Sequence, residues 1–245
     1  MFKKIVPIVL IALFFVPVVS AADLTLEDLM GKTHANQAKI KDMYAETETV
    51  MISSMSIPGQ TKKGPQKMVQ KGKMWTKGSD KSKIEMLSPT KQITITNGDK
   101  MLMINPETGQ KMVQDLSKIK GQGSRGQGPG EMSLEKAMEY FDLSLKKDND
   151  SYVITGIPKE RNKFMSKMEF YLDSKRWVPT KILMYGGNGK LLSRSEIEYE
   201  KISGVFVPVR NSSNVNTPMG KMEIEMVYSN IKVNQGIKDE VFRVE

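Results

Sequence analysis

Few residues in this sequence stand in a pattern that could do chemistry. The clearest is Gly121-Gln-Gly-Ser-Arg-Gly126, a G-x-G-x-x-G run of the kind that holds a dinucleotide pyrophosphate at the start of a helix. A dinucleotide site needs the helix to begin within the glycine run. Here loop residues continue to Gly130, and no alternating strand–helix pattern follows. We therefore interpret residues 121–130 as a loop, and we expect no cofactor.

Catalytic and metal-binding patterns are weaker still. His34 is the single histidine of the chain, and no serine lies in a G-x-S-x-G elbow. The carboxylate pairs Glu196/Glu198 and Glu223/Glu225 are spaced i, i+2, which places each pair on one face of a strand, and the neighbouring pattern makes that face the solvated one. We expect no catalytic residue and no metal site, so the sequence favours a protein that is not an enzyme.

The first residues predict export. Lys3 and Lys4 precede an apolar run over residues 5–16, and Val19-Ser20-Ala21 offers small residues before a cleavage site. The alternatives are a cut after Ala22 or an uncleaved membrane anchor, although the run is shorter than the roughly 20 residues that span a bilayer. We expect residues 1–21 to be a signal peptide that is cleaved after passage across the inner membrane, and residues 22–245 to form one periplasmic domain.

The composition agrees with a bacterial envelope protein. The chain has no cysteine, and its 37 Lys and Arg against 28 Asp and Glu give a net charge of +9. Export makes nucleic acid an unsuitable partner, and the charges are interleaved with apolar residues, as on a solvated sheet face. We interpret the basic balance as serving solubility.

The elements are mostly strands. Thr25-Leu-Glu-Asp28 is a capping box that opens a helix ending near Met43, and Ser133 caps a second helix that carries Leu134, Ala137, Met138 and Phe141 on one face. Candidate strands cover 44–56, 66–77, 81–87, 91–96, 100–105, 110–115, 152–157, 167–173, 178–185, 191–201, 205–211 and 221–228. Hairpin turns such as Asn97-Gly98 separate them. The sequence predicts a mainly β fold with one large, curved or closed antiparallel sheet.

Apolar residues alternate with polar ones on several of these strands. Met222, Ile224 and Met226 alternate with Lys221, Glu223 and Glu225. A turn at Asn97-Gly98 would pair Ile93 with Leu102, which places Ile93, Ile95, Leu102 and Ile104 on one face and Met101 and Met103 with Thr94 on the other. Methionine fills gaps in ordinary cores, but it also lines adaptable cavities. We hypothesise a wall for an acyl chain made of Ile93, Ile95, Leu102, Ile104, Met222, Ile224 and Met226.

The sequence resembles the bacterial outer-membrane lipoprotein carriers, the LolA-like or lipoprotein-sorting family. The resemblance lies in residues 71–87 (KGKMWTKGSDKSKIEML), 97–113 (NGDKMLMINPETGQKMV) and 173–190 (DSKRWVPTKILMYGGNGK), and in the ending from Val233, VNQGIKDEVFRVE. Two positions depart from the family pattern. Thr76-Lys77 follows Trp75 where the carriers have Lys-Arg, and Leu102 and Ile104 replace the hairpin Trp and Tyr. The resemblance is therefore to a divergent branch.

This resemblance implies an open antiparallel half-barrel of about eleven strands that encloses helices and holds acyl chains. It implies a periplasmic carrier that shields the acyl chains of a lipoprotein or lipid during transfer toward the outer membrane. An inner-membrane transporter and an outer-membrane acceptor would be its partners, and we expect a monomer. The alternative is a periplasmic sensor or interaction module built on the same half-barrel, which partners a membrane exporter or regulator.

Overall fold

The computed structural model describes residues 24–54, 64–118, 134–160 and 165–244. The expected signal peptide and the glycine-rich loop at 121–130 lie outside these residues. The helices are α1 (Leu26–Gln37), α2 (Leu134–Tyr140) and two short 3₁₀ turns, η1 (Leu116–Lys118) and η2 (Asp239–Phe242). The strands are β1 (Asp42–Ser53), β2 (Gln66–Lys77), β3 (Lys81–Ser88), β4 (Gln92–Asn97), β5 (Lys100–Ile104), β6 (Lys111–Asp115), β7 (Phe141–Asp148), β8 (Ser151–Pro158), β9 (Lys167–Asp173), β10 (Pro179–Tyr185), β11 (Leu191–Ile202), β12 (Val205–Thr217) and β13 (Gly220–Val233).

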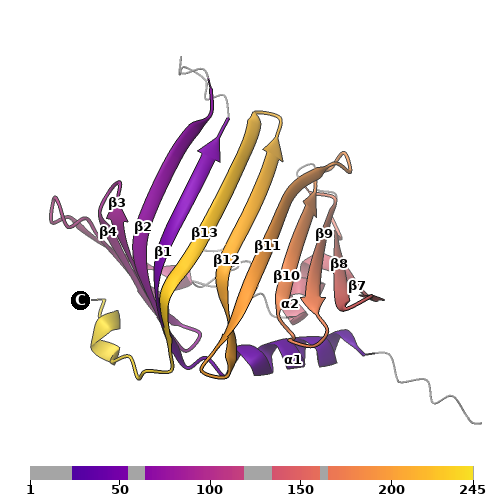
Figure 1. Ribbon diagram of the computed structural model, residues 1–245, viewed down its shortest axis with the longest axis horizontal. Helices are drawn as coiled ribbons and strands as arrows, with labels where there is room; N and C mark the ends of the chain where they lie inside the picture. The colour runs from indigo at the N-terminus through magenta and orange to yellow at the C-terminus, as the bar shows by residue number, and fades with distance from the viewer. Residues whose placement is uncertain (1–23, 55–63, 119–133, 161–164, 245) are drawn as a thin grey trace, which may run out of the picture.

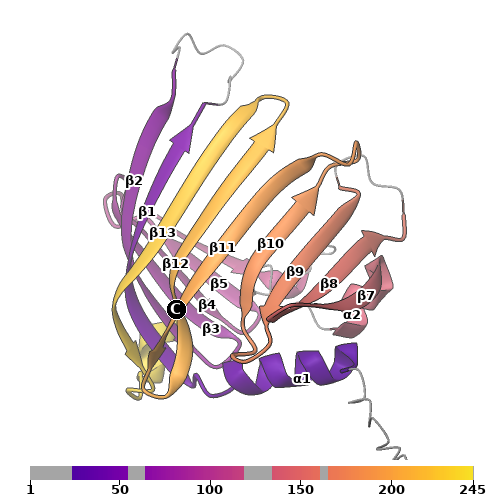
Figure 2. The ribbon, with the colours of Figure 1, turned by 45° about the vertical axis from the view of Figure 1, so that its right-hand side comes forward.

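All described strands join one antiparallel sheet of 13 strands, in the order β6-β5-β4-β3-β2-β1-β13-β12-β11-β10-β9-β8-β7. The sheet is strongly curved, so that β2–β5 form one arm and β7–β10 the other (Figures 1 and 2). It does not close, because β6 and β7 remain at its two edges. The predicted fold class, a mainly β open half-barrel, is confirmed, with more strands than expected.

Strand β7 was not predicted. Phe141 continues the helical stripe that begins at Leu134, and this concealed the alternation of Phe141, Leu143 and Leu145 with polar residues. In the structure the helix ends at Tyr140, and Leu145 pairs with Ile154 of β8. Pairing with β8 therefore decides the conformation of this segment over its helical pattern.

Helix α1 begins at the predicted capping box. The Thr25 hydroxyl accepts a hydrogen bond from the Asp28 N–H at 3.1 Å, and the Asp28 carboxylate accepts one from the Thr25 N–H at 3.3 Å. The helix ends at Gln37, earlier than the expected Met43, because β1 already pairs with both of its neighbours at Met43.

The hairpin between β4 and β5 differs in register from the prediction. Its two loop residues are Gly98 and Asp99, and Gly98 takes the positive φ of 57° that a two-residue turn requires. Ile93 therefore pairs with Ile104, two positions from the expected Leu102. Because side chains alternate with a period of two, this shift still leaves Ile93, Ile95, Leu102 and Ile104 together on one face, with Met101 and Met103 on the other.

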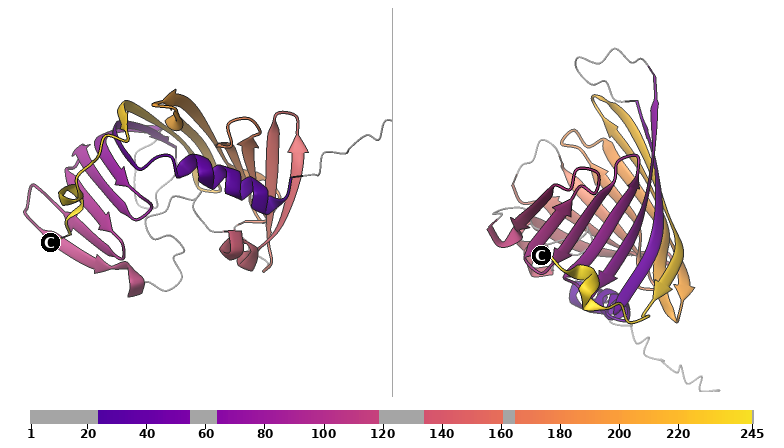
Figure 3. Two further views of the ribbon diagram at one scale, coloured as in Figure 1. Left: turned by 90° about the horizontal axis from the view of Figure 1, so that it is seen from below. Right: turned by 90° about the vertical axis from the view of Figure 1, so that its left-hand side faces the viewer.

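The register connects the same face across the whole sheet. Starting from β8, the directly paired residues are Ile154, Phe170, Ile182, Ser195, Ser213, Ile224, Met51 and Met68. Ile154 belongs to the cluster around Leu29 of α1, and α1 lies within the curve of the sheet (Figure 3). We call the face of this row the inner face and the opposite one the outer face.

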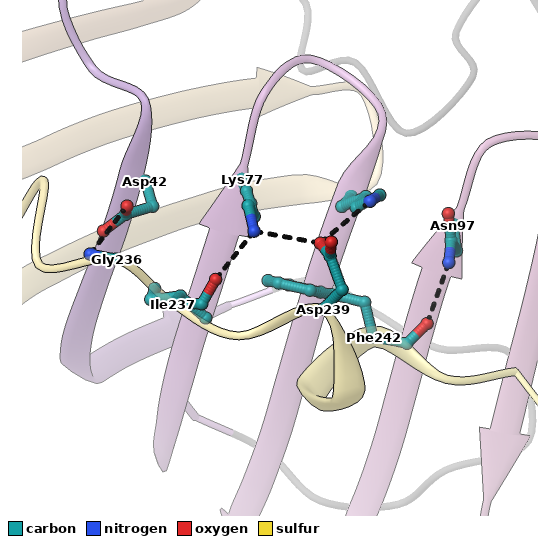
Figure 4. Close-up of polar contacts among 8 residues, drawn as sticks. Asp42, Lys77, Asn97, Gly236, Ile237, Asp239 and Phe242 are labelled. Carbon is teal, nitrogen blue, oxygen red and sulfur yellow. Dashed lines mark hydrogen bonds and ion pairs between the residues drawn. The ribbon is translucent and has the colours of Figure 1, made fainter.

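The C-terminal segment, residues 234–244, covers part of the outer face. Phe242 is fully buried there and packs with Ile95 and Leu102, and Figure 3 shows the segment on the outside of the curve. Polar contacts fix it along its length (Figure 4). Asp42 accepts from the Gly236 N–H at 3.0 Å, and Asn97 donates to the Phe242 carbonyl at 3.2 Å.

Removing the Phe242 ring should destabilise the fold. Phe242→Ala leaves a cavity between the C-terminal segment and β4–β5, and we expect it to lower the free energy of unfolding by about 3–5 kcal/mol in denaturant titration. Tyr140→Ala is the control, since Tyr140 is 53% exposed, and it should change stability by less than about 0.5 kcal/mol. Equal effects of the two variants would contradict the assigned packing.

Asp239 should make this attachment sensitive to acid. Hydrogen bonds from Lys81 and then Lys77 hold the pKa of Asp239 below its ordinary value of 3.8. A carboxylate with a depressed folded-state pKa stabilises the fold above its unfolded-state pKa, and loses that contribution as pH falls through the folded-state value. The melting temperature of Asp239→Asn should therefore lie below that of the native protein at neutral pH and converge with it below pH 3.8. A difference that persists unchanged into that acidic range would contradict the pairing.

Candidate functional site

The methionines are segregated to one side of the sheet. The register places every methionine of a described strand at an inner position: Met43, Met51, Met68, Met74, Met86, Met101, Met103, Met112, Met168, Met184, Met222 and Met226. Between them on β1–β6 stand threonine, serine, glutamine, alanine, glycine and isoleucine. The inner positions of these strands therefore carry no charged side chain.

The charges of the same strands lie on the outer face. On β13, Glu223 and Glu225 alternate with the inner residues, and Arg210 of β12 forms ion pairs with Glu225 and with Glu198 of β11. Lys71 and Glu48 form a further outer pair at 3.1 Å. The predicted reading of the carboxylate pairs as a solvated, structural face is thus confirmed, since these side chains are 43–68% exposed.

The two arms differ in how their inner faces are covered. On β7–β9, helix α1 packs its buried Leu29 against Ile154 and Leu172, with Trp177 at the margin of this cluster. That arm is an ordinary hydrophobic core.

The inner face of the other arm is open. Met68 is 43% exposed, Ile84 46% and Met112 51%, although all three occupy inner positions. At the β6 edge, an open hollow of about 800 Å³ is lined by residues that include Gln92 and Met103 together with Lys91 and Lys111. We call this open surface the methionine wall and define it as Met51, Met68, Ile84, Met86, Met101, Met103, Met112, Met222, Ile224 and Met226.

The hydroxyls of two tyrosines in the sheet, Tyr199 and Tyr228, stay neutral. Tyr228 pairs with Thr47 at an inner position, and burial raises the pKa of its hydroxyl. Burial likewise raises the pKa of Tyr199, and the neighbouring Tyr228 raises it further. The inner face therefore gains no charge from these groups as pH rises through the physiological range.

The structure does not bring the seven predicted wall residues together. Met222, Ile224 and Met226 lie on the inner face, within the methionine wall. The other four are on the outer face: Ile95 and Leu102 are 7% and 2% exposed, and Ile93 and Ile104 pack beside them against Phe242. The expectation that all seven form one surface is wrong.

The error has a physical cause. The hairpin is apolar on both faces, so its alternation alone does not say which face looks inward. Met101 and Met103, on the side opposite the four residues, are the ones that lie on the wall. One signal in the sequence could have distinguished the faces. Ile237, Val241 and Phe242 are apolar residues near the C-terminus that must pack against an apolar surface, and they pack against the outer face of this hairpin.

No constellation for metal binding appears in the described part of the chain. No group of three or more His, Asp or Glu residues there is arranged to hold a metal ion. His34 is exposed on α1. Within the same residues, no helix has the length and apolar character needed to cross a bilayer.

Comparisons with known proteins agree with this geometry. A family model described as "Uncharacterized protein" matches residues 131–245, and no curated protein matches the chain. Solved structures do match it along most of its length. A LolA superfamily protein from Nitrosomonas europaea superposes with a TM-score of 0.56 at 16% identity, over 89% of this chain and 97% of the other.

Two further structures match similarly, each at 16% identity. A DUF1329 family protein from Desulfovibrio piger gives a TM-score of 0.59 over 88% of this chain and 95% of its own. A putative outer membrane lipoprotein-sorting protein domain from Vibrio parahaemolyticus gives 0.56 over 87% and 95%. The chain therefore has the LolA-like fold, which confirms the resemblance found in the sequence.

Adjacent residues of β5 offer a direct test of the two faces. Leu102→Glu places a carboxylate in the 2%-exposed outer cluster, and we expect a loss of more than about 3 kcal/mol of stability or failure to fold. Met103→Glu places the same group on the open wall, so it should cost less than about 1 kcal/mol. Thermal and denaturant unfolding measure both. A larger loss for Met103→Glu would contradict the assignment of faces.

Proposed function

We propose that this protein is a periplasmic, non-enzymatic carrier that shields the acyl chains of a lipid or lipoprotein against the methionine wall. The observation that carries the proposal is that the exposed inner face of β1–β6 has no charged side chain at its strand positions, whereas the outer face of the same strands carries charges such as Lys71 and Glu48. The fold supports it, because a matching structure is described as a putative outer membrane lipoprotein-sorting protein domain.

The wall has the chemistry that an acyl chain requires. Moving an acyl chain into water costs roughly 0.8 kcal/mol per methylene, so a typical chain needs on the order of 10 kcal/mol of shielding. The wall offers thioethers, methyl groups and hydroxyls, with no charged group at an inner position of β1–β6. An acyl chain placed there would leave no ion desolvated, and it would cover the exposed surface of Met68, Ile84 and Met112.

The choice of methionine favours an adaptable surface. Methionine is unbranched, rotates about three side-chain bonds and carries a polarizable sulfur, so a methionine wall can adjust to chains of different length and shape. A wall of β-branched side chains would have a more rigid shape. We therefore infer that the protein accepts a range of acyl chains rather than one.

Transfer between membranes completes the proposal. Residues 1–21 would direct the chain across the inner membrane and be removed, which leaves the domain 22–245 in the periplasm. An inner-membrane transporter would load the wall and an outer-membrane acceptor would unload it. The open edge at β6, where the hollow lies, is the side from which a chain would enter.

Substitutions that introduce a charge on the inner face of β13 test the proposal. Ile224→Glu and Met226→Glu each place a carboxylate on the wall, and we expect each to weaken binding of a fluorescent fatty acid by roughly tenfold or more, because the carboxylate would be desolvated beside the ligand. The melting temperature should change little, since both side chains are only partly buried.

Val227→Glu is the matched control. Val227 lies on the outer face of the same strand and pairs with Arg210, so this variant should bind like the native protein. Native protein that binds no fatty acid would overturn the proposal. So would Ile224→Glu and Met226→Glu variants that bind normally.

A further inference from the structure

We propose that the methionine wall is a site of oxidative modification, at which hydroperoxide-class oxidants convert the thioethers of the empty protein to sulfoxides and so prevent it from binding an acyl chain. This inference rests on the proposed function and adds a regulation of the same site. The observation behind it is the segregation of the methionines of the described strands to the inner face, together with the absence of cysteine from the sequence.

The wall methionines are reachable by a small oxidant. Met112 and Met68 are 51% and 43% exposed. The fully packed clusters, by contrast, contain a single buried methionine, Met43, which is 7% exposed. Oxidation should therefore modify the wall before it reaches the core.

The chemistry needs only the thioether and the oxidant. The sulfur lone pair attacks the distal oxygen of hydrogen peroxide, the O–O bond breaks, an S–O bond forms and water leaves after proton transfer. The sulfur is oxidised by two electrons and the peroxide is reduced by two. The product is a sulfoxide, a strong hydrogen-bond acceptor in place of an apolar sulfur.

Sulfoxides would make the wall polar, whereas acyl-chain binding depends on an apolar wall. Each sulfoxide oxygen recruits water, and an acyl chain on the wall would have to displace that water without offering a hydrogen bond. The methionines of the wall lie beside one another across the strands: Met103 pairs with Met112, and Met51 pairs with Met68. Several sulfoxides would thus fall under one chain.

The bound ligand should in turn protect the wall. An acyl chain that covers Met68 and Met112 removes their exposed surface, so that the empty protein is oxidised and the loaded protein is spared. The wall would then stop loading under oxidative conditions without release of cargo already carried.

The test compares hydrogen peroxide treatment of the native protein and of two methionine-to-leucine variants. Treated native protein should bind a fluorescent fatty acid roughly tenfold more weakly than untreated protein, with a nearly unchanged far-ultraviolet circular dichroism spectrum. A variant with Met68→Leu, Met103→Leu, Met112→Leu and Met226→Leu should keep its affinity within about threefold after treatment, because leucine preserves the apolar volume.

The control variant, Met138→Leu with Met219→Leu, removes exposed methionines outside the wall, and treatment should still weaken its binding roughly tenfold, as for the native protein. Peptide mass spectrometry should find sulfoxide at Met68 and Met112 before Met43, and less of it when fatty acid is present. Normal binding by treated native protein, with Met68 and Met112 oxidised, would overturn the inference and leave the carrier function standing. Failure of untreated protein to bind would instead overturn the carrier function, and the inference with it.

Discussion

The two-residue alternation of one continuous antiparallel register is the constraint on which the rest of this structure depends. A single row of paired residues runs from Ile154 on β8 to Met68 on β2 without changing face, despite the bulges elsewhere in several strands. On β13 a shift of one residue would bring Glu223 or Glu225 to the inner position that Ile224 now holds. The separation of thioethers from charges is therefore a property of the register as a whole.

An open sheet of this size exposes two faces, and each must be solvated or covered. Charged pairs such as Lys71–Glu48 solvate part of the outer face, and the C-terminal segment with Phe242 covers the apolar cluster around Ile95 and Leu102, whereas Val113 and Ile157 stay exposed. Helix α1 covers the inner face of one arm. The inner face of the other arm also has exposed apolar side chains. Their exposure leaves room for a bound apolar ligand to cover them. These exposed side chains are the basis of the role proposed for the methionine wall, because a bound acyl chain would bury them.

The sequence contained most of the fold but not the location of the site. Capping at Thr25 and the strand alternation depend on neighbouring residues and can be read locally. Strand β7 could not, since Phe141 satisfies a helical and an extended pattern at once, and only its partner β8 decides between them. Only the β13 part of the wall was predicted correctly. On β13 charged residues mark the outer face, whereas on β4–β5 both faces are apolar and the alternation does not distinguish them. Only the long-range contact of Leu102 with Phe242 separates inside from outside there.

The central claim is that the methionine wall binds acyl chains, and methionine methyl groups report on it directly. Protein labelled with ¹³C at the methionine methyl positions can be titrated with a fatty acid and followed by two-dimensional NMR, with each signal assigned by substitution. We expect chemical-shift changes and fatty-acid contacts at Met68, Met103, Met112 and Met226, and unchanged signals for the exposed Met138 and Met219. Fatty-acid contacts confined to methionines outside the wall, or no contact at any wall methionine at saturation, would contradict it.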